Sequence, residues 1–241
     1  MDPAPDRLTH RLTDPEADMS DVILIQPTRT PLADGVEALE VRLGGTQRGL
    51  IILLTDETTP EVEVFEAMNT FAMEGFESLA VAVSPDIEVL AEARARMCGW
   101  SAEQTGIVGI GAGGTLALDL ARRRTFGAAV SISPVPDVAA VAADPVLCTP
   151  WLGLFGADAG DVTTSDLVRL QNVLDDGSDV FSRVVVYPGV GVDFHRRTED
   201  GISFSASYDG WQRTVEWLLA RVAARLTPLA VSWRERQETA S

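Results

Sequence analysis

The stretch of the chain with the most chemical information spans residues 107 to 115 and reads IVGIGAGGT. It predicts a strand, a tight glycine turn and the start of a helix. Gly109 and Gly113 stand two residues before and two residues after Gly111. That spacing lets a strained turn lift the middle side chain above a sheet, where a Ser, Cys or Asp could attack a carbonyl. Glycine has no side chain, so Gly111 cannot act as a nucleophile.

The same stretch also fits the pattern GxGxxG through Gly109, Gly111 and Gly114. In dinucleotide-binding proteins this pattern seats a pyrophosphate on a helix N-terminus, follows the first strand, and has an acid about 20 residues later. Here four predicted strands precede the glycines, and the nearest acid beyond the next strand is Asp137. Dinucleotide binding therefore stays as an alternative, and we predict no cofactor.

Acid and base candidates follow the later predicted strands. His195 is one of two histidines, and the other, His10, lies in a polar N-terminal stretch. His195 is therefore the predicted base at neutral pH. Asp158 and Asp161 follow a predicted strand and could orient the imidazole. With these groups the chain would be a weak or non-standard hydrolase, which we keep as a second alternative.

An alternation of strands and helices must position these residues. The sequence predicts strands at 21–27, 36–43, 50–55, 78–83, 106–110, 128–132, 151–155 and 184–187, and helices at 60–74, 86–98, 113–124, 138–143, 165–174 and 208–226. The run at 50–55 is apolar throughout, as in a parallel strand covered on both faces. The alternation predicts a mostly parallel sheet of about eight strands with helices on both faces, a three-layer sandwich. Ligands bind such sheets at the carboxyl ends of the strands.

The chain has no break in composition that would divide it, so we predict one α/β domain at 21–226 with a polar arm at 1–20 and a tail at 227–241. The tail contains the sequence LAVSW at 229–233, which is too apolar for a free end. We expect it to pack against its own domain or into a second subunit, and we favour the second subunit. A homo-oligomer formed through the tail is thus a predicted assembly.

Composition excludes several functions. The formal charge of -17 and a sequence pI near 4.4 argue against nucleic acid and anionic membranes as partners. The absence of lysine removes Schiff-base chemistry and a Walker-type phosphate loop. The two cysteines, Cys98 and Cys148, predict buried thiols and no disulfide framework. The first twenty residues lack the apolar stretch of a signal peptide, so we expect a cytoplasmic protein.

Over residues 20–226 the chain resembles the dienelactone hydrolase family of α/β-hydrolases. The motifs that carry the resemblance are the 50–56 strand and its tip, FAMEGF at 71–76, GIVG at 106–109 with Gly113-Gly114, AAVS at 128–131, Phe155-Gly156, VYPG at 186–189, and Tyr208 with WQR at 211–213. The resemblance implies an α/β-hydrolase fold and the hydrolysis of esters or lactones.

The catalytic residues of that family do not carry over. The resemblance places the family's nucleophile on Gly111, its acid on Ala159 and its histidine on Val192. His195 follows three residues after the last of these positions. Thr55-Asp56 stands where the family usually has a His-Glu pair. All three positions of the triad are therefore substituted.

The leading hypothesis is a degenerate family member, a pseudoenzyme, that binds a small molecule or a protein partner. The candidate binding residues lie at strand ends and at the helix start: Thr55, Asp56, Gly111, Ala112 and Gly113. Acids near the same strand ends favour a cation over an anion. We predict no metal site, because no spaced His or Cys ligands accompany the acids. Acids clustered at the first helix predict a solvated face, with a basic partner surface as the alternative.

Overall fold

The computed structural model describes residues 24–32, 35–56, 58–84, 86–160, 162–196 and 201–239. Its strands are β1 (Thr28–Pro31), β2 (Glu37–Val41), β3 (Gly49–Thr55), β4 (Phe76–Ala82), β5 (Thr105–Ile110), β6 (Ala128–Ile132), β7 (Trp151–Gly156) and β8 (Ser182–Tyr187). Its helices are α1 (Glu61–Met73), α2 (Ile87–Met97), α3 (Ala112–Arg123), α4 (Val138–Ala143), α5 (Thr164–Gly177), α6 (Gly201–Arg221) and α7 (Pro228–Thr239).

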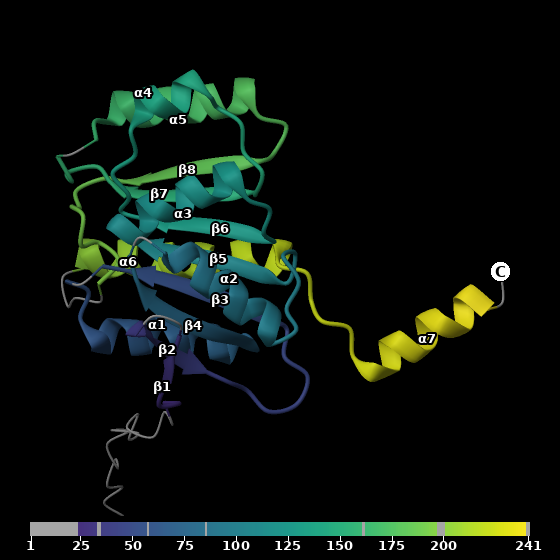
Figure 1. The fold of residues 1–241 in the computed structure, drawn as a ribbon. Helices are drawn as coiled ribbons and strands as arrows, with labels where there is room; N and C mark the ends of the chain where they lie inside the picture. The colour runs from purple at the N-terminus through teal and green to yellow at the C-terminus, as the bar shows by residue number, and fades with distance from the viewer. Residues whose placement is uncertain are drawn as a thin grey trace, which may run out of the picture.

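The strands form one eight-stranded sheet in the order β1-β2-β4-β3-β5-β6-β7-β8. β1 pairs antiparallel with β2, and β2 pairs antiparallel with β4. From β4 through β3 to β8, each adjacent pair of strands is parallel. Helices α1 and α6 cover one face, while α2, α3 and α5 cover the other (Figure 1). The mostly parallel sheet and the three layers predicted from the sequence are confirmed.

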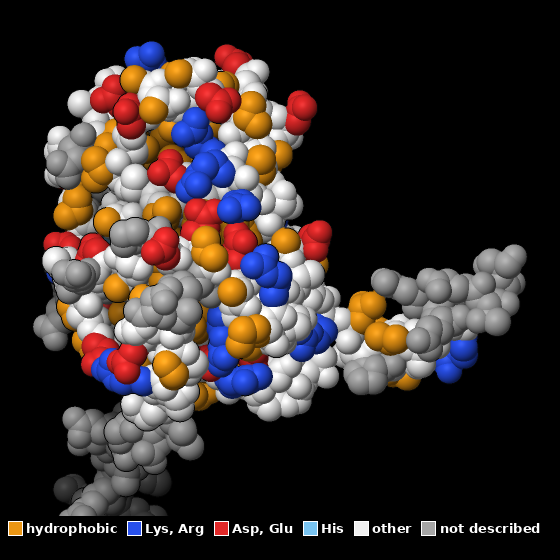
Figure 2. All heavy atoms as spheres, in the orientation of Figure 1, with side chains coloured by type: hydrophobic (Ala, Val, Ile, Leu, Met, Phe, Trp, Pro, Cys, Tyr) orange, Lys and Arg blue, Asp and Glu red, His pale blue; other side chains and the backbone are white. Residues whose placement is uncertain are grey.

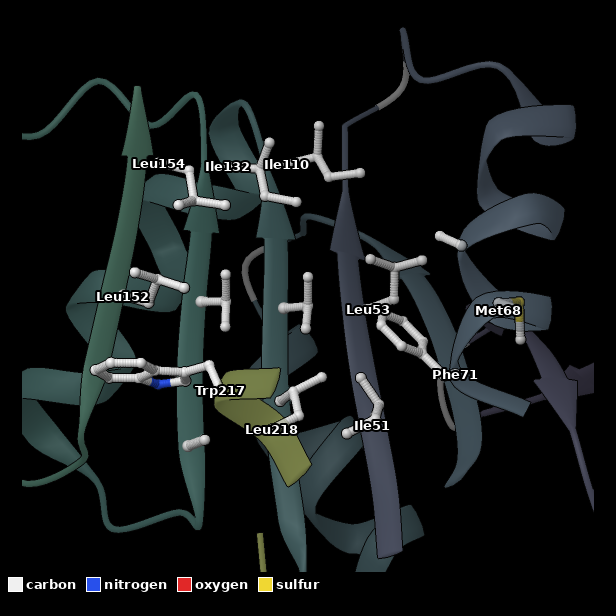
Figure 3. Packing of buried hydrophobic residues seen from close by; sticks show 14 of the residues in the cluster. Ile51, Leu53, Met68, Phe71, Ile110, Ile132, Leu152, Leu154, Trp217 and Leu218 are labelled. Carbon is white, nitrogen blue, oxygen red and sulfur yellow. The ribbon is translucent and has the colours of Figure 1, made fainter. Parts of the chain in front are cut away.

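The hydrophobic core on one face of the sheet is formed with side chains of α1 and α6. Figure 3 shows Trp217 and Leu218 of α6 lying over the strands, with Phe71 and Met68 of α1 beside them. Every residue of β3 is buried, as expected of an apolar strand between two layers. The tips of β3 and β5 lie next to one another because the two strands pair in parallel from Leu50 to Leu54 of β3.

The prediction of a strand at 21–27 was wrong. Residues 24–27 form no strand, residues 21–23 lie outside the described residues, and the edge strand β1 begins at Thr28. The reason is a side chain on α1: Asn69 accepts a hydrogen bond from the Ile25 amide and donates one to the Ile25 carbonyl. These bonds satisfy the backbone of the apolar segment against a helix instead of a strand.

The closing helix was predicted at 208–226 and is found at Gly201–Arg221. Two backbone amides after its end bond elsewhere, Ala223 N–H to the carbonyl of Glu103 and Arg225 N–H to that of Arg48. These bonds hold residues 222–225 against the sheet's amino-terminal edge. The tail then forms α7, which stands away from the domain (Figure 1).

Three smaller expectations concern the surface and the ends. Cys148 is exposed, so the prediction of a buried thiol is wrong there, since its sulfur lies outside the packed layers at 3.2 Å from the Arg122 carbonyl. Within the described part of the chain, no helix is long and apolar enough to cross a membrane. The arm at 1–20 lies outside the described residues, and the division into arm, domain and tail stays a prediction.

Candidate functional site

The turn between β5 and α3 has a backbone shape that only closely approaching glycines allow. Gly111 adopts φ +57° and ψ -118°, which L side chains rarely adopt. A Cβ added to Gly109 would lie 2.0 Å from the Gly113 carbonyl oxygen, and one added to Gly113 would lie 2.1 Å from that of Leu54. Strand, turn and helix therefore pack backbone to backbone, in the form of a nucleophile elbow without its nucleophile.

The third glycine of the GxGxxG pattern is also a packing residue. A Cβ on Gly114 would lie 3.0 Å from the Ile132 carbonyl oxygen, and the Gly114 carbonyl accepts a hydrogen bond from the Ser131 hydroxyl. Close packing thus accounts for these glycines without a phosphate. Ala112 is exposed and begins α3, so its amide lies in the helix's unbonded first turn. Dinucleotide binding stays a prediction from the pattern alone.

A carboxylate lies beside the missing side chain. Asp56 Oδ2 is 2.9 Å from the point where a Cβ on Gly111 would lie. Asp56 Oδ1 accepts hydrogen bonds from the Thr58 amide at 2.8 Å, the Thr58 hydroxyl at 2.6 Å and the Thr59 hydroxyl at 3.1 Å. The bond from the Thr58 hydroxyl is the main cause that lowers the pKa of Asp56, so this carboxyl group is ionised at neutral pH. Its charge opposes an anion at the turn.

The structure brings together the two positions where the resemblance placed an acid and a histidine. Ala159, after β7, and Val192, after β8, line one small cavity of about 10 Å³ together with Phe155 and Val162. Ser133 lines it as well, and its hydroxyl donates to the Val192 carbonyl. Neither Ala159 nor Val192 has a group that can transfer a proton, and the space is too small for a substrate.

His195 is packed beneath the surface on the α1 side of the elbow. It is 8% exposed, and its backbone carbonyl accepts hydrogen bonds from the Ser207 hydroxyl at 2.9 Å and the Trp211 indole at 3.0 Å. Its Nδ1 lies 3.2 Å from the Val192 carbonyl oxygen, which favours the tautomer with a proton on Nδ1. Burial is the main cause that lowers the pKa of His195, and Arg196 lowers it further.

Glu63 of α1 is a site residue that sequence reasoning missed. Its Oε2 lies 3.9 Å from His195 Nε2, and its Oε1 lies 3.1 Å from Arg196 Nε. Oε2 is buried and has no hydrogen-bond partner in the described structure. Burial raises the pKa of Glu63 despite the nearby Arg196. A cavity of about 20 Å³, room for about one water molecule, lies among these groups.

Glu63 belongs to a cluster of acids at the start of α1, which the sequence predicts to be a solvated face. The first turns of α1 contain Glu61, Glu63 and Glu66, and a cluster of acids in such a place usually marks a solvent-exposed face. Only the return of the chain at His195, more than a hundred residues later, places one of these acids against a histidine. No periodicity in the sequence encodes that contact.

The proposed partners of His195 are not its neighbours. Asp158 is exposed, and no hydrogen bond or ion pair joins it to His195 among the described residues. Asp161 lies outside the described residues.

Ser131, at the end of β6, has a hydroxyl near the elbow that is already hydrogen-bonded in both directions. It donates to the Gly114 carbonyl and accepts from the Trp151 indole at 2.8 Å.

Two of the candidate binding residues line a cleft at the tip of β3. Thr55 and Asp56 form part of a cleft of about 200 Å³ between α1 and strands β2 and β4. Glu37, Glu61 and Arg29 line the same cleft, and Arg29 forms an ion pair with Glu61 at 2.5 Å. Gly113 is buried below the elbow and does not reach the cleft's lining. The described residues contain no group of three or more His, Cys, Asp or Glu side chains that could hold a metal ion.

A comparison with family models matches residues 59–221 to the dienelactone hydrolase family. No curated protein matches the chain. Among solved structures, a proposed dienelactone hydrolase from Klebsiella pneumoniae is 19% identical with a TM-score of 0.64, over 80% of this chain and 97% of that chain. A dienelactone hydrolase from Anabaena variabilis is 18% identical with a TM-score of 0.58, over 82% of this chain and 100% of that chain. At these identities the structures establish a shared fold.

Proposed function

Because the chain belongs to the dienelactone hydrolase family, we propose that it is a member without covalent hydrolysis that acts by binding. The observation that carries the proposal is the elbow itself. Its backbone keeps the strained shape that presents a nucleophile, yet the residue there is Gly111. The atom nearest to a Cβ at that place is an oxygen of Asp56, not a hydroxyl or a thiol. No acyl intermediate can form on a glycine.

The loops after β7 and β8 support the same conclusion independently. A triad needs a base to take a proton from the nucleophile and an acid to orient that base. Ala159 and Val192 occupy those two positions and contact a mostly apolar cavity. His195 has a lowered pKa and is therefore a neutral base, but its Nε2 faces Glu63 within the layer between α1 and the sheet.

For the ligand we infer a small molecule with a cationic or hydrogen-bond-donating group, held in the cleft at the tip of β3. The ionised Asp56 and the acids Glu37 and Glu61 line that cleft. Arg29 forms ion pairs with both glutamates, at 2.5 Å with Glu61 and at 4.0 Å with Glu37, so its single positive charge is shared between them. The remaining negative charge favours a cation by simple Coulomb attraction. The cytoplasmic location and the protein-partner alternative stay predictions of the sequence.

The first experiment measures hydrolysis. Purified protein is assayed with p-nitrophenyl acetate and with a dienelactone, beside Gly111→Cys and His195→Ala variants. We expect the wild type to show no turnover above the uncatalysed rate. Wild-type turnover at ordinary enzyme rates of about 1 per second or more, abolished by His195→Ala, would overturn the proposal and favour the non-standard hydrolase.

The second experiment measures binding by the thermal midpoint of unfolding. Choline serves as the cationic probe and acetate as the anionic probe, each at millimolar concentration. We expect choline alone to raise the midpoint, because a ligand that binds only the folded state stabilises it. Asp56→Asn should remove the shift, and Asp158→Asn, an exposed acid outside the cleft, should keep it. A shift with acetate, or one insensitive to Asp56→Asn, contradicts the cleft assignment.

A further inference from the structure

The helix α7 carries a row of exposed hydrophobic side chains. Leu229 and Trp233 are four residues apart, which places them on one side of the helix, and the exposed Leu226 lies just before its first residue. Leu229 is 75% exposed and Trp233 is 59% exposed. Figure 1 shows α7 standing away from the domain, and Figure 2 shows hydrophobic side chains on its surface. We call this row the α7 stripe.

A short helix that stands away from its domain needs a packing surface to be stable. α7 has 12 residues, and isolated helices of about 12 to 15 residues are only marginally stable in water. Its internal cap is modest: the Thr227 hydroxyl accepts a bond from the Ala230 amide at 3.2 Å. Most helical stability in proteins comes from packing an apolar side against something else. The stripe is therefore the surface that α7 should bury.

The domain offers a matching groove between α1 and α6. It has a volume of about 440 Å³, and the residues that line it are Thr70, Met73, Glu74, Phe204, Ser207, Tyr208, Trp211, Gln212 and Val215. Met73 and Tyr208 project from its two sides and are mostly exposed. The rings of Phe204 and Tyr208 stack in parallel at 6.4 Å between centroids. The aromatic and aliphatic side chains make much of the groove apolar.

The charges of the groove and the stripe are complementary. Glu74 lines the groove, and α1 carries the further exposed acid Glu66 and no basic residue. Arg236 follows Trp233 by three residues, so it extends the α7 stripe by one turn. An apolar stripe that ends in an arginine thus meets an apolar groove that carries a glutamate.

The attachment of α7 directs it towards a second molecule. Arg225 fastens the preceding segment: its amide bonds to the Arg48 carbonyl, its guanidinium donates to the Gly99 carbonyl, and that group lies 3.6 Å over the Trp100 ring. Only two residues separate Arg225 from the first residue of α7. The helix leaves this fixed point away from its own domain (Figure 1).

We propose that α7 of one copy docks through Leu229, Trp233 and Arg236 into the α1–α6 groove of a second copy, and that the exchange is mutual. Such a twofold contact closes on itself and uses each groove once. Thr70 and Trp211 line both this groove and the cavity beside His195. The docked helix therefore covers the flank of the candidate site. The proposal does not depend on the loss of catalysis.

The first test is the molar mass in solution, measured by light scattering across a concentration series of the full chain. We expect a species of twice 25.8 kDa. Trp233→Asp should raise the dissociation constant about thirtyfold or more, as expected for an aromatic anchor. Val168→Asp on α5 is the matched control, because Val168 is 57% exposed on the opposite face of the sheet. A wild-type monomer at every concentration, or a dimer unaffected by Trp233→Asp, overturns the proposal.

The second test uses complementation between two variants. Trp233→Asp spoils the stripe and leaves the groove intact, and Tyr208→Asp spoils the groove and leaves the stripe intact. Both residues are exposed, so both variants should fold. Each variant alone should be monomeric where the wild type is dimeric. Mixing the two restores one intact contact, so a heterodimer should appear; a mixture that stays monomeric, or a dimer of either variant alone, contradicts the mutual exchange.

Discussion

The β5–α3 elbow and the loops after β7 and β8 meet at the same edge of the sheet, yet different kinds of contact hold the two regions in place. At the elbow, added Cβ atoms on Gly109 and Gly113 would come within about 2 Å of backbone oxygens. In the loops, Ala159 and Val192 touch a cavity of about 10 Å³, and Val192 is partly exposed. The elbow is constrained by close contacts between backbones, whereas Ala159 and Val192 in the loops have room for other side chains.

Under the proposed loss of catalysis, this difference explains how the fold can persist without the reaction. A residue needed for close packing cannot change without moving a strand or a helix. A residue needed only for proton transfer can become alanine or valine with little cost to stability once the reaction is no longer required. Under the same proposal Gly111 belongs to both groups: its φ of +57° is a conformation that L side chains rarely adopt, and it has no side chain that could attack a carbonyl.

The largest expected effect comes from Gly109→Ala. The added Cβ would lie 2.0 Å from the Gly113 carbonyl oxygen, so the turn must open. We expect the free energy of unfolding to fall by about 4 kcal/mol or more, measured by urea denaturation. Gly44→Ala is the control, because nothing lies within 4 Å of its added Cβ, and it should change stability by less than about 0.5 kcal/mol. Equal effects of the two substitutions would contradict the constraint argued for the elbow.

Much of this constraint could be predicted from the sequence. The glycine spacing at 109, 111 and 113 predicted the turn, and the apolar runs predicted β3, β5 and β6 close to their observed bounds. Short-range patterns suffice there, since each element is determined by its own residues. The first strand failed because the Asn69 side chain, 44 residues away, binds the Ile25 backbone.

The candidate site could be predicted only in part for the same reason. Asp56 and Gly111 were selected because strand ends meet at one edge of a parallel sheet, and they do lie together. The contact between Glu63 and His195 depends on how a long loop after β8 turns back over α1. The sequence placed His195 near Asp158, whereas burial against α1 and α6 holds it elsewhere.

A second prediction rebuilds the triad on the retained framework. Gly111→Cys, Ala159→Asp and Val192→His are combined in one protein. If the loops still match the elbow, the triple variant should hydrolyse p-nitrophenyl acetate about 100-fold faster or more than Gly111→Cys alone, which is the usual contribution of a positioned base. Initial rates check this, and circular dichroism checks folding. A folded triple variant without a gain would show that the loops have moved as well as lost their side chains.

Ser131→Ala tests whether a hydroxyl near the elbow has a structural role. The Ser131 hydroxyl donates to the Gly114 carbonyl and accepts from the Trp151 indole inside the core, so its removal leaves the buried indole N–H without this acceptor. We expect a loss of about 1 to 3 kcal/mol in the free energy of unfolding and no change in the hydrolysis rate. Ser205→Ala, an exposed serine of α6, is the control. A wild type that hydrolyses p-nitrophenyl acetate, together with a stable Ser131→Ala variant that does not, would make Ser131 a nucleophile.

The smallest effect concerns the pH dependence of stability and separates His195 from Glu63. Burial is the main cause that lowers the pKa of His195 below its ordinary 6.5. The unfolded chain therefore takes up the proton first, so stability is full above pH 6.5 and falls as the pH drops through the folded-state pKa. Burial raises the pKa of Glu63 above 4.5, so below that raised value the folded state takes up the proton first and stability changes in the opposite direction.

Urea denaturation at pH 7.5, 6.5 and 5.5 can distinguish the two contributions. The wild type should lose more stability than His195→Gln between pH 6.5 and 5.5, because the variant lacks the group that the unfolded chain protonates. The comparison uses the slopes with pH, since the substitution itself changes the absolute value. A wild type that gains more stability than His195→Gln over this interval would mean that His195 charges in place and pairs with Glu63 across their 3.9 Å separation. The loop after β8 would then be held by an ion pair to α1, so it would be more constrained and would differ less from the elbow.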